Sequence, residues 1–138
     1  MALYTTAGGI LQEEKPIHDR DGALFKGILM RNLRLLVDAC VLAPHWAPNL
    51  HQVALYRAFI NKNVQSMVAN AQTADGLYGA DWQGPVDPHA AGCQQPGKAD
   101  CGNATGTVPQ ISALELLSAS ICQCEGCCDL SDGGGHHQ

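Results

Sequence analysis

A run of apolar residues at helical spacing between residues 21 and 42 constrains the fold of this chain more than any other feature. Large apolar side chains and one cysteine recur there every three or four residues, the period of one side of an α-helix: Phe25, Ile28, Leu29, Leu33, Leu36, Val37 and Cys40. We therefore predict a helix from about Leu24 to Leu42 with this stripe buried. Asp21 can cap its first turn, because a carboxylate accepts hydrogen bonds from the unpaired N–H groups there. Pro44 stops it.

A second helix is predicted after a short proline-rich link. Asn49 is a suitable cap for a helix that reaches about Gln72. Its apolar side is formed by residues at the same helical spacing: Val53, Tyr56, Ile60, Val64, Met67, Val68 and Ala71. Because the link is short, the first two helices should form an antiparallel hairpin.

The rest of the chain is predicted to hold one more helix. Residues 73–107 are rich in Gly, Pro, Asp and Gln and should form a long irregular loop. A last helix should begin near Thr107 or Val108 with Pro109 in its first turn. Its expected buried stripe is Ile111, Leu114, Leu117 and Ile121. Residues 1–12 read as the end of a helix. We therefore expect one all-α domain over residues 1–121 and a disordered Cys-, Gly- and His-rich tail over residues 122–138.

Composition excludes some classes of partner. The 138 residues carry a formal net charge of −5, which argues against binding to nucleic acid or to an anionic membrane surface. No stretch approaches the roughly 20 apolar residues that span a bilayer. The first residues also lack the basic and apolar regions of a secretory signal, so the sequence alone does not locate the chain.

The seven cysteines suggest different chemistry in two places. Cys93 and Cys101 bracket a polar loop and would form a disulfide in an oxidising compartment. Asn103 begins a glycosylation sequon, which has meaning only in a secreted protein. The tail adds four cysteines and two histidines, side chains that suit zinc. However, no second Cys-x-x-Cys pair follows at a finger-like distance, so we assign no metal site and no cofactor.

Three segments resemble glycoside hydrolase family 76, the endo-α-1,6-mannanases of fungi and bacteria. They are Asp-Gly-x-x-Phe-Lys-Gly-Ile with Arg-Asn-Leu at 21–33, Asp-Gly-Leu-Tyr-Gly-Ala-Asp-Trp-Gln-Gly-Pro at 75–85, and the helical segment 110–117. The resemblance covers roughly residues 3–121 and only the C-terminal part of the family. It implies helical hairpins from the C-terminal part of an (α/α)6 toroid, α-mannan or a related polysaccharide as partner, and an extracellular or cell-wall setting for the parent family.

The resemblance also implies a retaining hydrolase with two consecutive aspartates as its catalytic pair. This sequence contains no Asp-Asp dipeptide, and its nearest equivalent is Asp19-Arg20-Asp21. Because glycoside hydrolysis needs two carboxylates, we expect a truncated glycoside hydrolase that is inactive alone, and we assign no catalytic residue. An isolated part of a toroid exposes apolar helix faces, so we expect marginal stability, aggregation or self-association. The alternative is a non-enzymatic helical module that binds glycan or a partner protein.

Four residues are candidates for contact with a sugar, and each has a structural alternative. Asp21 would hold a sugar hydroxyl, or it caps the helix. Lys26 would pair with a carboxylate in the cleft, or its ammonium reaches water beside an apolar surface. Tyr78 and Trp82 lie together in a glycine-rich loop. The Trp82 ring would stack on a pyranose, or it anchors the loop on the core.

Overall fold

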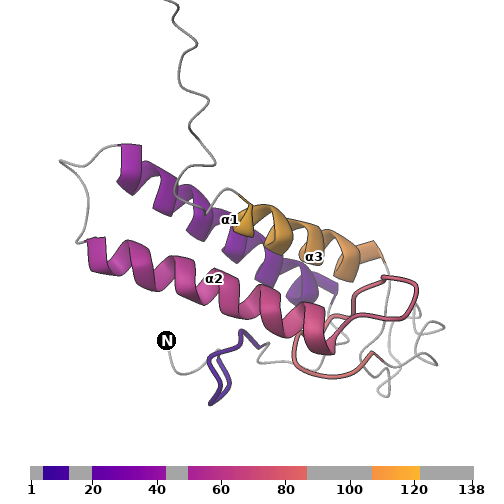
Figure 1. Cartoon of the computed structure of the whole chain (residues 1–138). Coiled ribbons are helices and arrows are strands. Elements are labelled where there is room, and N and C mark those ends of the chain that lie inside the picture. Colours follow the sequence, from indigo (N-terminus) through magenta and orange to yellow (C-terminus); the bar gives the residue numbers. More distant parts are fainter. Residues whose placement is uncertain (1–4, 13–19, 43–49, 87–106, 122–138) are drawn as a thin grey trace, which may run out of the picture.

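The computed structural model describes residues 5–12, 20–42, 50–86 and 107–121. These residues form three helices, α1 Arg20–Leu42, α2 Leu50–Asn70 and α3 Thr107–Ser120, and within the described ranges there is no extended strand. The predicted all-α fold is confirmed (Figure 1). Helix α1 ends where the sequence predicted but begins at Arg20, so Asp21 lies within its first turn instead of preceding it. None of the described helices is long and apolar enough to cross a membrane.

Helices α1 and α2 form the predicted antiparallel hairpin. Val37 and Cys40, in the last part of α1, pack with Val53 in the first part of α2. Nearer the other end of the hairpin, Met30 of α1 shares the larger core cluster with Met67 of α2. Late residues of α1 therefore meet early residues of α2, and the two helices run in opposite directions (Figure 1).

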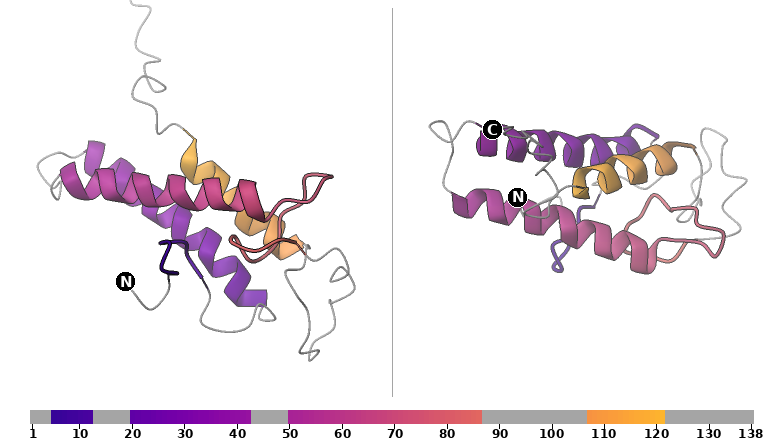
Figure 2. Two further views of the ribbon diagram at one scale, coloured as in Figure 1. Left: turned by 60° about the horizontal axis from the view of Figure 1, so that its bottom comes forward. Right: turned by 45° about the horizontal axis from the view of Figure 1, so that its top comes forward.

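Helices α1 and α3 run parallel and lie very close together (Figure 2). Three hydrogen bonds join them: Gly27 to Ser112, Arg31 to Glu115, and Arg34 to the Ala119 carbonyl. The paired residues are 85, 84 and 85 positions apart in the sequence. Because this separation is nearly constant, the two helices run in the same direction. A Cβ atom placed on Gly27 would lie only 2.7 Å from the Ser112 Cα. Only a glycine in α1 permits this approach, because any side chain there would overlap the backbone of α3.

The close approach changes which side of α1 is buried. Val37 and Cys40 are buried as predicted, but the prediction is wrong for Phe25, Leu29 and Leu36, which are 62%, 46% and 45% exposed. The other interior positions of α1 are taken by Met30 and by a charged residue, Lys26.

Helix α3 shows the same reversal. Ile111, Leu114 and Ile121 were expected in the core, but all three are exposed. The buried residues are mostly small: Ser112, Ala113, Leu116 and Ala119. Because small residues let two backbones approach, they occupy the contact between the helices, and the larger apolar residues are left on the outer sides.

The sequence pattern predicts the buried side of α2 well, but it does not predict the structure of residues 5–12. Of the apolar side predicted for α2, only Val68 is exposed. Residues 5–12 form a tight hairpin and no helix, which corrects the prediction for that segment. Thr5 pairs with Leu11 across a turn in which Gly9 has a φ of 73°. The buried Asn63 side chain holds this hairpin on α2 by accepting the Leu11 N–H at 2.8 Å.

Candidate functional site

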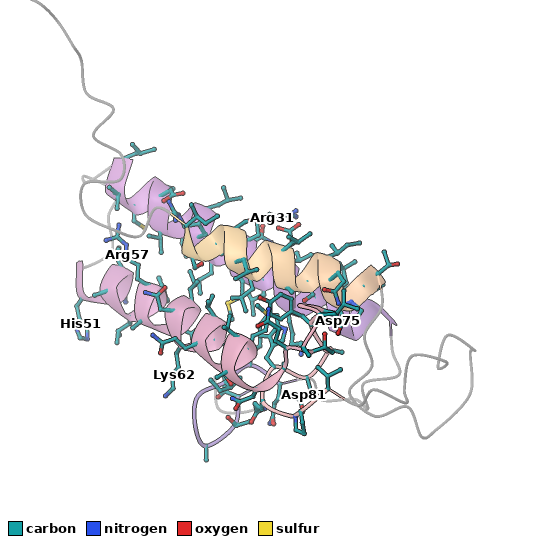
Figure 3. All side chains as sticks on the ribbon, turned by 45° about the vertical axis from the view of Figure 1, so that its right-hand side comes forward. Arg31, His51, Arg57, Lys62, Asp75 and Asp81 are labelled. Atoms are coloured by element: carbon teal, nitrogen blue, oxygen red, sulfur yellow. The ribbon has the colours of Figure 1, made fainter. Side chains whose placement is uncertain are left out.

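All four candidate residues belong to elements at one end of the helix bundle. Helix α2 ends there, α1 and α3 begin there, and residues 71–86 extend from this end (Figure 1). We call residues 71–86 the loop segment. Its two labelled acids, Asp75 and Asp81, lie at this end, whereas Arg31 lies on the far side of the molecule from α2 (Figure 3).

The first half of the loop segment is an ordered hairpin, although its sequence predicted an irregular loop. Gln72 and Tyr78 form an isolated bridge. The Thr73 N–H donates to the Leu77 carbonyl at 2.8 Å, and the Leu77 N–H donates to the Thr73 hydroxyl at 2.9 Å. Gly76 supplies the turn with a φ of 84°, a conformation that glycine adopts without steric cost. The hairpin fixes the backbone of Tyr78.

Helix α3 holds Tyr78 through a side chain that pattern analysis did not single out. The Gln110 amide nitrogen donates to the Tyr78 carbonyl at 2.7 Å, and the Tyr78 N–H donates to the Gln110 amide oxygen at 3.1 Å. The amide thus pairs with Tyr78 as a neighbouring strand would. The Tyr78 ring is half-buried, and its hydroxyl lies 3.1 Å from the Gln72 amide nitrogen, which donates to it. Gln110 begins the third segment that resembles the mannanase family, but nothing in the sequence indicates that its side chain contacts Tyr78.

Trp82 anchors the second half of the loop segment. Its side chain is completely buried in the main core cluster, and its carbonyl accepts a hydrogen bond from the Ser66 hydroxyl of α2 at 2.8 Å. The indole N–H has no acceptor among the described residues. In this arrangement the ring offers no free face on which a sugar could stack, so Trp82 lies where the loop-anchor alternative would put it.

Lys26 lies against the Trp82 ring. Its side chain is 5% exposed, its ammonium donates to the Ala80 carbonyl, and its Nζ is 4.7 Å from the centre of the ring. A cation over an indole face is attracted by the electron density of the ring. A lysine at the edge of an apolar surface would instead keep its ammonium in water. The structure therefore brings together two residues that were separate candidates in the sequence, and their contact joins α1 to the loop segment.

Three acidic residues lie at this end among the described residues, and side-chain positions are described for Asp75 and Asp81. Asp21 lies in the first turn of α1, and Asp75 is exposed. Asp81 is half-buried and accepts the Gln83 N–H at 3.0 Å, a local turn that aspartate often forms. Across the described ranges, no group of three His, Cys, Asp or Glu residues is placed to hold a metal ion.

Several predicted features fall outside the described residues. They are the disulfide between Cys93 and Cys101, the sequon at Asn103, and the tail 122–138. Cys40, by contrast, is described: it is buried and has a free thiol.

Comparisons with known proteins give one likeness. No family model and no curated protein matches the chain. Among solved structures, the chain is similar to the GH76A alpha-1,6-mannanase from Salegentibacter sp. HEL1_6, with 25% sequence identity and a TM-score of 0.56. The likeness covers 83% of this chain but only 27% of the mannanase chain. The described helices therefore have a fold similar to part of a GH76 enzyme.

Proposed function

We propose that this chain is a glycoside-hydrolase-like helical unit that binds an α-mannan or a related polysaccharide at its loop end. The observation that carries the proposal is the likeness in fold and sequence to a solved GH76 mannanase over 83% of the chain. The chain spans about a quarter (27%) of the length of that enzyme. We therefore propose a part in substrate binding and not the whole reaction.

The loop segment is suited to binding because each helix fixes it separately. Lys26 of α1 holds the Ala80 carbonyl, Ser66 of α2 holds the Trp82 carbonyl, and Gln110 of α3 holds Tyr78. A binding surface works best when its backbone is fixed before the ligand arrives, since less conformational freedom is then lost on binding.

The four candidate residues would have two different roles in sugar binding. Tyr78, whose ring is half-buried, and Asp21, at the start of α1, are the proposed direct contacts with sugar. A tyrosine ring suits the apolar face of a pyranose, and a carboxylate accepts hydrogen bonds from its hydroxyl groups. Lys26 and Trp82 are buried, so we propose that they support the loop from beneath and act on sugar binding through it.

The same proposal holds that the chain does not hydrolyse mannan by itself. Hydrolysis of a glycosidic bond requires an acid and a nucleophile or base on opposite sides of it. The sequence has no Asp-Asp dipeptide. Incubating the chain with α-1,6-mannan and measuring reducing ends should show no release above the buffer control. Reproducible release would refute this part of the proposal without affecting the binding part.

Binding is tested by affinity electrophoresis in gels that contain α-1,6-mannan. We expect the mannan to retard the wild-type chain, and dextran, an α-1,6-linked glucan, to retard it less. Replacing Tyr78 by Ala should weaken retardation roughly fivefold, since a lost aromatic contact is worth about 1 kcal/mol. Tyr56→Ala is the matched control, because this half-buried tyrosine of α2 packs on Val37, Cys40 and Val53. Equal migration of the wild-type chain with and without mannan would refute the proposal.

A further inference from the structure

Three cationic residues of α1 contact α3 or the loop segment and leave one outer side of the helix without a charge. Lys26 is buried, Arg31 pairs with Glu115 of α3 at 2.7 Å, and Arg34 reaches backbone carbonyls at the end of α3. The opposite side of α1, about half a turn away, carries Phe25, Leu29, Asn32 and Leu36, all exposed. We call these four residues the α1 seam. A surface helix normally turns its charges outward and its apolar stripe inward.

Helix α3 has a second outer side of the same kind. Its exposed residues there are Ile111, Leu114, Ser118 and Ile121, which we call the α3 seam. The only charged residue of the helix, Glu115, is bonded to Arg31 of α1. Contiguous uncharged apolar strips of this kind on a protein surface usually mark a place of contact with another macromolecule.

The two seams match one another residue by residue. Successive residues are 4, 3 and 4 positions apart in the α1 seam, and 3, 4 and 3 positions apart in the α3 seam. Alternating steps of three and four let two helices that cross at a small angle interlock their side chains. Each seam contains three large apolar residues, and in each the third position is polar, Asn32 and Ser118. If the two seams are aligned in parallel, each α1 residue faces an α3 residue that lies 85 or 86 positions later in the sequence. This offset is nearly the one that already relates α1 to α3 inside the chain.

We propose that copies of this chain associate head to tail, the α3 seam of one copy packing in parallel against the α1 seam of the next. Asn32 would then face Ser118, so that neither polar group is buried without a partner. Packing α1 against α1 would place Asn32 opposite apolar residues unless the two were in register, and it would leave the α3 seam uncovered. A contact between two different surfaces closes into a ring or extends as a chain. The proposal does not depend on carbohydrate binding.

The test measures mass in solution by sedimentation velocity over a range of protein concentrations. The wild-type chain should form species at multiples of 14.6 kDa that grow with concentration. Leu29→Asp and Leu114→Asp should each be monomeric, because each disrupts one of the two seams that form the proposed contact. An equimolar mixture of the two variants should form a dimer and nothing larger, since one intact seam of each kind remains. Leu55→Asp changes an equally exposed leucine of α2 and should assemble like the wild type.

Three results would overturn the proposal: a monomeric wild-type chain, a mixture of the two variants that stays monomeric, or assembly that only one of the variants disrupts. The last result would indicate a symmetric contact of one seam with itself. Circular dichroism confirms that each variant is folded. If an aspartate unfolds the chain, Leu29→Asn and Leu114→Asn repeat the test with a smaller change.

Discussion

Replacing Gly27 by alanine should destabilise this chain, although alanine has the higher intrinsic propensity to form a helix. A Cβ atom at this position would lie 2.7 Å from the Ser112 Cα and 2.8 Å from the Ser112 carbonyl oxygen. Ordinary contacts begin near 3.4 Å, so α1 and α3 would have to separate by about 0.7 Å. Both obstructing atoms belong to the backbone, and therefore no rotation of a side chain relieves the contact.

The expected change combines two terms of opposite sign. Alanine is favoured over glycine inside a helix by about 1 kcal/mol. Forcing an extra methyl group into a packed contact costs about 1–3 kcal/mol. A gap of this size also forfeits roughly a quarter to a half of the dispersion attraction between the separated atoms, and it lengthens the Gly27 N–H bond to the Ser112 hydroxyl from 3.1 Å. We expect a net loss of up to about 2 kcal/mol in the free energy of unfolding.

The assay is urea unfolding followed by circular dichroism at 222 nm, at a concentration where wild type and variant are both monomeric. Ala58→Gly, at an exposed position of α2, gives the propensity term by itself and should cost about 1 kcal/mol. Adding Ser112→Gly to the Gly27→Ala variant should not restore stability, because the backbone contacts persist and a glycine inside α3 itself costs about 1 kcal/mol. If Gly27→Ala is more stable than wild type by about 1 kcal/mol, the close approach of α1 and α3 is wrong.

Three other substitutions test single contacts. Asn63→Ala should cost about 1–3 kcal/mol, since it leaves a buried N–H of the hairpin at 5–12 unpaired, and protease should then cut that hairpin faster. Gln110→Glu should destabilise the chain at pH 7, where a carboxylate faces the Tyr78 carbonyl. Unfolding measured near pH 4 should recover part of the loss, because the protonated carboxyl is again a donor. Glu115→Gln should change stability by under about 1 kcal/mol, with weak salt dependence, because the Arg31 side chain of its ion pair is about half exposed to solvent.

Carbohydrate contacts were predicted from residue type, and burial decides how each can act. Lys26, Tyr78 and Trp82 were recognisable as candidates from the segments that resemble a mannanase. Our proposal that some of them support the loop and others contact sugar required the structure, because only the fold shows that the Lys26 ammonium lies over the buried Trp82 ring. Gln110 was not found at all, since a hydrogen bond to a backbone 32 residues away leaves no periodic signal.

The sequence by itself determined the helices and the hairpin that joins α1 to α2. Helical periodicity, the prolines and the short link are local properties, and local properties specify where a helix begins and ends. Which sides of α1 and α3 are buried was decided by tertiary structure, whereas the buried side of α2 follows its periodicity. Periodicity gives most weight to large apolar residues, but the α1–α3 contact is formed where Gly27 meets Ser112, because only small residues allow that approach. Phe25, Leu29, Ile111 and Leu114 consequently lie outside, although Met30, Val37 and Leu116 are buried. No pattern within one helix could have predicted that division.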